Sequence, residues 1–283
     1  MTTRSRIMLL GLAAAAICVA GPAAAQEQRA FLYNKFEFSP SVTSVLLNSD
    51  IRIDSENGSI GTDVDAEDDL GLDEMKWEPR FAVRWRPGRH HEIEGGYQFA
   101  RRNSEIQLQR TITIRDTTFD AGLNVRTHLN TDLAFLNYRY AIIAKDKTQA
   151  GVGIGTGALL FDTAVEALAF AGSNDVTYSS SAKLTVPVGA FGIYGRFLIG
   201  TDWSTEVDAR IVKLQIDRFD VQFSQLNAAG RYFPSPKWGV ELGAGIDAAK
   251  VDIGPREGAR AQVEGRIKYS LTNIRFGVIY AVR

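Results

Sequence analysis

The sequence predicts an all-β fold: an antiparallel, up-and-down transmembrane β-barrel of about ten strands, with eight to twelve possible. Three observations predict it. Many segments alternate apolar and polar residues with a period of two, aromatic residues recur at the ends of these segments, and short turns alternate with longer connections along the chain. Past the N-terminal segment, no stretch approaches the ~18 apolar residues of a transmembrane helix. A membrane-embedded chain of this kind must therefore close its strands into a barrel.

The N-terminal segment has the features of an export signal. Arg4 and Arg6 precede an apolar run over 7–20, and 23–25 is a run of alanines suited to signal cleavage. Cys18 is the only cysteine and would be removed with the signal. Disulfides and thiolate chemistry are therefore excluded from the mature chain.

We accordingly divide the chain into three parts. These are a signal peptide over 1–25, a periplasmic N-terminal lead over 26–43 and the barrel over 44–283. The formal net charge is −1, with 32 basic and 33 acidic residues. Without a basic excess, nucleic acid is not expected as a partner.

The segment 77–86 shows the strand pattern most clearly, because one face is apolar and the other is charged. The apolar face begins and ends with tryptophan, and eight strand steps on a tilted strand separate the two indoles by roughly 20 Å across a sheet. That distance is close to the height of the apolar band of an outer-membrane barrel. The apolar face carries Trp77, Phe81, Val83 and Trp85, and the charged face carries Glu78, Arg80, Arg84 and Arg86.

The remaining strands follow the same rhythm. Apolar phase flips near 100–103 and near 271–272 indicate either a bulge or a tight hairpin, which leaves the strand count open. The longer connections are expected at 55–76, 161–182 and 251–260. Strands are predicted over 44–54, 77–86, 91–114, 122–142, 149–158, 183–199, 203–211, 218–233, 238–248 and 261–271, the last continuing into 274–282.

The charged strand face is expected to point into the lumen. A soluble barrel would instead place its apolar face inside, but glycines stand among the charges, and a glycine makes room for a long arginine in a narrow barrel. The resulting lumen charge network is either a polar plug or a charge-lined solute path. Its predicted members are Glu78, Arg80, Arg84, Arg86, Glu92, Glu94, Arg139, Glu206, Asp208, Arg210, Glu241, Glu264, Arg266 and Lys268.

An acidic stretch over 54–74 is the one candidate for a bound metal. It has no basic residue, and five of its carboxylates are spaced to offer oxygens to Ca²⁺. The alternative is a solvated external loop. No other cofactor is expected. The five candidate ligands are Asp63, Asp65, Glu67, Asp68 and Asp69.

The acidic box over 63–73 resembles that of a group of uncharacterised proteobacterial outer-membrane β-barrel proteins. The arginine-rich strand and Arg-Pro-Gly-Arg-His turn within 85–97 are similar too. The resemblance implies the outer membrane of a Gram-negative cell, outer-membrane lipid and lipopolysaccharide as partners, and the barrel-insertion machinery during biogenesis. It implies no substrate.

Catalytic residues are scarce. The chain has three histidines, and His128, with Ser104 or Ser181 as a conceivable neighbour, is the nearest approach to a hydrolase triad. No nucleophile motif surrounds either serine. We therefore expect a non-catalytic barrel that serves envelope structure or surface interaction through loops 55–76 and 161–182. The alternatives are a narrow passive porin and a lipid A-modifying enzyme.

Overall fold

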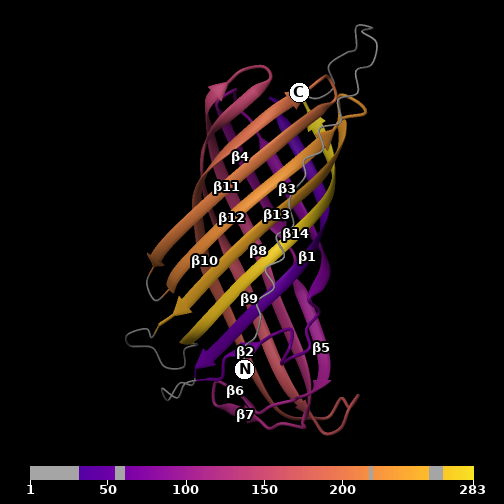
Figure 1. Cartoon of the computed structure of the whole chain (residues 1–283), viewed down its shortest axis with the longest axis vertical. Helices are drawn as coiled ribbons and strands as arrows, with labels where there is room; N and C mark the ends of the chain where they lie inside the picture. The colour runs from indigo at the N-terminus through magenta and orange to yellow at the C-terminus, as the bar shows by residue number, and fades with distance from the viewer. Residues whose placement is uncertain (1–31, 55–60, 217–218, 255–263) are drawn as a thin grey trace, which may run out of the picture.

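The computed structural model describes residues 32–54, 61–216, 219–254 and 264–283. Long tilted strands form the whole wall of the molecule (Figure 1). Within these ranges, no helix is long and apolar enough to cross a membrane. The strands are β1 (Phe36–Asp54), β2 (Val64–Asp65), β3 (Met75–Trp85), β4 (His91–Gln98), β5 (Arg101–Gln107), β6 (Ile112–Ile114), β7 (Thr117–Phe119), β8 (Asn124–Ala144), β9 (Thr148–Leu168), β10 (Val176–Ile199), β11 (Trp203–Ile216), β12 (Phe219–Tyr232), β13 (Trp238–Ile253) and β14 (Glu264–Val282).

The long strands form a closed antiparallel ring. Each pairs with its neighbour in chain order, and β14 pairs with β1 to close the barrel. Strands β4 and β5 both pair with β8, so together they occupy one strand position in the wall. Each strand position of the ring is called a stave below. With β4 and β5 taken together, the ring has ten staves, which confirms the predicted count of about ten and the up-and-down topology.

Two predicted boundaries are corrected. Strand β1 already pairs at Phe36, with Val282 on one side and Trp85 on the other, so 36–43 belongs to the barrel and not to the N-terminal lead. The predicted loop 161–182 is mostly strand, because β9 and β10 stay paired as far as Leu168 and Val176. The second error arises because β9 and β10 extend well beyond the zone in which their outer face is apolar, whereas 36–43 lies within that zone, with Phe36, Phe38 and Val42 exposed on its outer face.

The two ends of the barrel differ in their connections. The turn end carries the short turns at 87–90, 145–147, 200–202 and 234–237, and the loop end carries the longer connections. The C-terminus lies at the turn end, and β2, β5, β6 and β7 lie at the loop end (Figure 1).

An apolar belt surrounds the turn-end half of the barrel. Aromatic pairs mark its turn-end rim: Trp203 packs on Tyr232 with ring centroids 4.8 Å apart, and Trp238 packs on Tyr280 at 5.0 Å. Soluble proteins rarely expose so continuous an apolar surface. Exposed members of the belt include Phe38, Val42, Leu46, Trp77, Phe81, Val83, Trp85, Leu136, Ile154, Phe191, Ile193, Val207, Ile211, Leu226, Leu242, Ile246, Ile274 and Phe276.

The apolar face changes sides toward the loop end. On β14, Ile274 is exposed in the belt, whereas Ile267 and Leu271 are buried inside the barrel. Arg266 and Lys268 consequently point outward, where they pair with Asp252 and Asp50 respectively. Their predicted place in the lumen is wrong, and the side chain of Glu264 lies outside the described residues. The phase flip near 271–272 marks this reversal within one continuous strand.

The loop-end half is packed like a water-soluble barrel. Its interior is one apolar core to which the walls and the 61–74 segment both contribute. The core includes Ile51, Ile53, Val64, Leu70, Leu72, Ile112, Phe119, Val125, Leu129, Phe161, Val165, Leu184, Val186, Phe219, Val221, Val251 and Ile267. A soluble barrel was expected to place its apolar strand face inside. The structure has this arrangement, but only in the loop-end half.

The belt makes a testable prediction on strand β11. Val207→Lys is expected to lower the free energy of unfolding in a bilayer by about 2–4 kcal/mol, because it places a cation on the lipid face near mid-depth. Gln215→Lys lies on the outer face of the same strand beyond the belt and is expected to change it by less than ~0.5 kcal/mol. Guanidinium unfolding of protein folded in phospholipid vesicles measures both. Equal effects would show that residue 207 does not face lipid.

Candidate functional site

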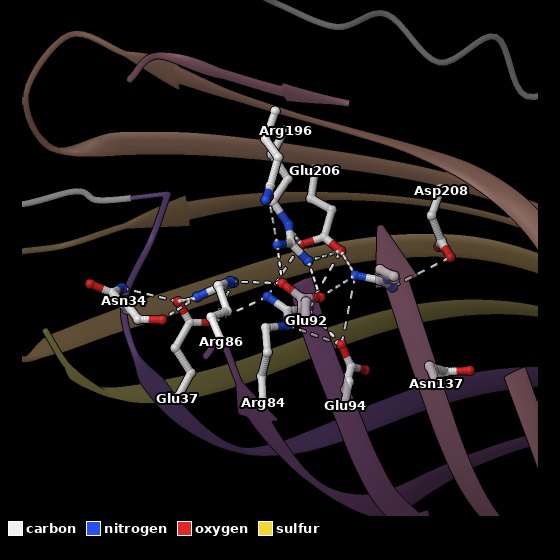
Figure 2. Close-up of polar contacts among 12 residues, drawn as sticks. Asn34, Glu37, Arg84, Arg86, Glu92, Glu94, Asn137, Arg196, Glu206 and Asp208 are labelled. Atoms are coloured by element: carbon white, nitrogen blue, oxygen red, sulfur yellow. Dashed lines mark hydrogen bonds and ion pairs between the residues drawn. The ribbon is translucent and has the colours of Figure 1, made fainter. Parts of the chain in front are cut away.

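The lumen of the turn-end half is filled by a lumen charge cluster of six arginines and six acids. Every one of the ten staves contributes a side chain to it. The charged members come from nine staves, and strand β9 contributes Gln149, whose Oε1 accepts a hydrogen bond from Arg196. Figure 2 shows charged members from β1, β3, β4, β10 and β11 meeting inside the barrel. The charged members of the cluster are Arg84, Arg86, Arg139, Arg196, Arg231 and Arg275, with Glu37, Glu92, Glu94, Glu206, Asp208 and Glu241.

Glu206 on β11 is the centre of the cluster. Its carboxylate lies 2.7 Å from Arg139 Nη1, 2.8 Å from Arg196 Nε, 3.1 Å from Arg231 Nη2 and 3.4 Å from Arg84 Nη1. Four strands are thus tied to a fifth through one side chain. A carboxylate offers about four lone-pair sites, so this coordination uses nearly all of its capacity.

Glu92 on β4 repeats this arrangement from the part of the wall beyond β8, β9 and β10. It lies 2.7 Å from Arg86 Nε, 3.1 Å from Arg139 Nη1 and 3.3 Å from Arg84 Nε, and it also binds Arg196. The two glutamates therefore share three arginines, which makes the cluster a continuous network and not a set of separate pairs.

Glu37 extends the network to β1. Its Oε2 accepts a hydrogen bond from Arg84 Nη1 at 3.1 Å, and its Oε1 accepts from Arg86 Nη1 and from Asn34 Nδ2, each at 3.0 Å. Glu37 is 2% exposed and Glu92 is 1% exposed. At this depth an unpaired carboxylate would be costly, so the arginines are needed to keep these acids ionised.

Glycines on the inner face leave room for the long arginines. A Cβ at Gly153 would lie 3.2 Å from Arg139 Cγ, and one at Gly243 would lie 3.2 Å from Arg275 Nη2. These contacts are tighter than ordinary packing, so a larger residue at either position would require the neighbouring arginine side chain to shift by a few tenths of an ångström. The predicted reason for glycine beside the charged face is confirmed at these two positions.

Apolar side chains seal the cluster on its turn-end side. Phe233, Ile279 and Ala281 are buried there, with Leu198 packed against them. Toward the loop end, a cavity and then the apolar core of the other half follow. The cluster is therefore enclosed on both sides and shielded from bulk water.

The structure brings together most of the predicted lumen residues. Arg84, Arg86, Glu92, Glu94, Arg139, Glu206, Asp208 and Glu241 belong to the cluster. Arg80 and Arg210 are attached at its loop-end edge, through Glu94 at 3.3 Å and Asp208 at 2.7 Å. Glu78 also faces inward but accepts its hydrogen bond from Gln98 instead.

Sequence reasoning missed four members of the cluster. Glu37 was assigned to the lead, and Arg196, Arg231 and Arg275 each stand alone among apolar or small residues. Extending the period of two along each strand would have found them, since each falls on the inward phase of its strand.

The five acidic residues proposed to bind calcium are not gathered around one point. Glu67 is buried against Arg102 and accepts the Ser49 N–H at 2.8 Å. The carboxylate of Asp65 caps the backbone N–H groups of Glu67 and Asp68. Among the described residues, no group of three or more His, Cys, Asp or Glu side chains could hold a metal ion. The predicted calcium site therefore does not assemble.

Asp69 is also occupied. Arg110 Nε and Nη2 bind its two oxygens at 2.7 Å and 2.5 Å, and these hydrogen bonds lower the pKa of Asp69 below its usual value. Asp63 is exposed, and its carbonyl accepts a hydrogen bond from the same arginine. Arg110 thus binds Asp69 in place of the Ca²⁺ ion that the acidic stretch was expected to bind.

The serine–histidine pairings considered from the sequence do not form. His128 points outward and contacts Asn103 Oδ1 at 2.6 Å, whereas Ser104 points inward and donates to the Leu70 carbonyl. Ser181 faces outward, but Ala164 stands between it and His128 in the register, two strand spacings or roughly 10 Å in all. Neither serine is within hydrogen-bond reach of the histidine.

The chain is similar to solved barrel structures but not to any family model. No family model matches it, and no curated protein matches it. Its structure is similar to the outer membrane protease OmpT from Escherichia coli, with a TM-score of 0.56 at 9% identity, covering 89% of this chain and 98% of that one. It also matches the outer membrane protein OprG from Pseudomonas aeruginosa, with a TM-score of 0.36 at 12% identity over 91% and 100% of the chains. The likeness to OmpT shows a shared barrel fold and nothing beyond it.

The cluster makes a stability prediction at its centre. Glu206→Gln is expected to lower the free energy of unfolding by about 3–5 kcal/mol, because it leaves four buried guanidinium groups short of one negative charge. Asp146→Asn removes one partner of an exposed pair with Arg89 and is expected to cost no more than about 1 kcal/mol. Guanidinium unfolding in vesicles compares them. A loss at Glu206 as small as that at Asp146 would contradict a shielded cluster.

The loop end makes a separate prediction about the 61–74 segment. Glu67→Gln is expected to accelerate cleavage of this segment by a protease that cuts after acidic residues about tenfold, because it removes charge-assisted hydrogen bonds worth ~1.5–3 kcal/mol. Asp68→Asn also removes one cleavage site, but Asp68 is exposed, so its cleavage rate is expected to stay unchanged. Rates followed by mass spectrometry on folded protein test this. Equal rates in both variants would show that Glu67 does not hold the segment.

Proposed function

We propose that this protein is an integral outer-membrane β-barrel with its turn end in the periplasm and its loop end outside the cell. The apolar belt supports this location, because so large an exposed apolar surface requires lipid. The aromatic pairs at its turn-end rim match the girdle typical of such barrels. The export-like N-terminal segment and the shared fold with OmpT agree with the same location.

We further propose that the lumen is closed and that the protein has no catalytic activity. The observation that carries this proposal is the lumen charge cluster, which joins side chains from all ten staves at the centre of the barrel. Its ion pairs cross the lumen: Arg84 on β3 meets Glu206 on β11, 122 residues away in the chain. A solute or ion could pass only by breaking several shielded contacts at once.

The proposed role is envelope structure or surface interaction through the loop end. The loop-end half projects beyond the apolar belt and is made rigid by its own core. Two described features of the loop-end surface, the 61–74 segment and the turn at 169–175, are fixed to that core or to the wall. A rigid, projecting surface is suited to binding other envelope or external molecules.

A narrow passive porin is the second candidate. The observation that favours it is a cavity of about 240 Å³ in the lumen, between the cluster and the loop-end core. If the cluster rearranged, this cavity would become part of a continuous path lined by charges.

Conductance distinguishes the two candidates. Refolded protein in planar bilayers is expected to show no steady ion conductance, because the cluster blocks the lumen. Insertion is verified by heat-dependent electrophoretic mobility, so that silence is not caused by failed folding. Steady conductance in the unaltered protein would contradict the closed lumen. A change of ion selectivity on Arg84→Gln or Arg210→Gln would then establish the porin.

A further inference from the structure

We propose that the lumen cavity is a binding site for a small monocarboxylate with an apolar body, such as an aromatic or short-chain aliphatic acid. This inference goes beyond the proposed function, since it concerns what occupies the barrel and not where the barrel sits. Three features of the cavity carry it: the unused donors of its arginines, the charge balance of its lining and the apolar side chains opposite.

Three arginines at the edge of the lumen charge cluster present donors to the cavity. Arg275 uses Nε for Glu241 at 2.8 Å, and Arg80 uses Nη2 for Glu94 at 3.3 Å. Arg210 uses Nε and Nη1, the latter for an amide oxygen at 2.9 Å. A guanidinium carries five N–H donors. Within the described chain these hydrogen bonds use at most two donor nitrogens of each group, and all three residues line the cavity.

The charge of the cavity lining favours a single anion. Six arginines line it against five carboxylates, a local surplus of one positive charge. Over the whole described lumen, the numbers of positive and negative groups are closer to equal. Glu37 and Glu92 do not line the cavity, however, because they lie on the turn-end side of the cluster, behind the arginines that they bind. The lining groups are Arg80, Arg84, Arg139, Arg210, Arg231 and Arg275, with Glu94, Glu206, Asp208, Glu241 and Asp247.

The rest of the wall combines uncharged polar side chains, such as Thr131, Gln225 and Asn227, with apolar ones. Leu159, Val188, Phe223, Ile267 and Leu271 line the cavity on the side of the loop-end core. A ligand that satisfied the arginines would therefore place any apolar part against these side chains. Water alone could solvate the arginine side but would gain little from the apolar side.

The volume sets the size of the ligand. At about 240 Å³, the cavity is larger than an engineered cavity of ~150 Å³ that binds benzene. It is smaller than the ~300–1,000 Å³ pockets that hold drug-sized molecules. One ring or a short alkyl chain with a carboxylate fits between these limits. A carboxylate is the anion of choice, because its two oxygens match the planar fork of an arginine.

The test uses full-length folded protein and fluorine NMR with 4-fluorobenzoate as the probe. Saturable binding is expected, and neutral 4-fluorobenzamide is expected to bind at least ten times more weakly because it cannot neutralise the arginines. The amide partitions into detergent at least as well as the acid, so it also controls for nonspecific uptake. Equal binding of acid and amide, or no saturable binding of the acid, would overturn the proposal in favour of a water-filled cavity.

Variants locate the site. Arg210→Gln is expected to weaken 4-fluorobenzoate binding about 10- to 100-fold, the range for one charge-assisted hydrogen bond, whereas Arg210→Lys retains most of the affinity. Ala249→Phe, which fills the cavity from β13, is expected to abolish binding. Arg101→Gln changes an arginine on the outside of the barrel, 61% exposed, and is expected to have no effect.

These outcomes are separable from those of the conductance experiment. Saturable binding by a conducting protein would remove the closed lumen and leave the site in place. Binding that is unaffected by Ala249→Phe would place the probe elsewhere and overturn the site, whatever the conductance.

Discussion

Successive side chains of a β-strand point to opposite faces, and this alternation is the constraint on which the barrel depends. Where the outer face meets lipid, it must be apolar, so every charged residue of that zone is turned inward. Ten staves enclose only a narrow lumen, and an inward arginine or glutamate there cannot reach bulk water. It must find a polar partner inside the barrel, either on a neighbouring strand or across the lumen. The apolar belt and the lumen charge cluster are therefore two consequences of one pattern.

Toward the loop end, the apolar side chains lie on the inner face of the strands. This follows from the same alternation, because the outer face there meets water and not lipid. On β1, Leu46 is the last outward apolar residue, and Asn48 and Asp50 follow it on the outer face, while Val45 and Leu47 are buried inside. Beyond the belt the outer face is polar and the inner face is free to become a core. This explains how strands far longer than the ~9–11 residues needed to cross a bilayer remain stable. The loop-end half does not need lipid, because it buries its apolar residues in itself.

The fold was largely predictable from sequence, and the failures have physical reasons. Alternation and turn spacing are local, so the strand 77–86 and the ring of about ten staves could be derived. Alternation does not say which face is inside, however, and Arg266 was assigned to the lumen because it alternates as Arg84 does. The contacts of the site were beyond reach for another reason. Arg84 and Glu206 meet across the lumen only because closure of the barrel fixes the angle between β3 and β11, and no local pattern encodes that angle.

The cluster explains how one register is selected. The apolar belt alone is a weak guide, because a strand that slipped by two residues would keep its apolar face toward lipid. Such a slip moves each inward side chain by about 6.6 Å along the strand, which is enough to break every ion pair that it makes. On β11 the slip would withdraw Glu206 from four arginines and leave them unpaired in the lumen, at a cost of several kcal/mol. Nine of the ten staves contribute a charge to the cluster and are held by this penalty, so the buried charges supply the specificity that the belt lacks.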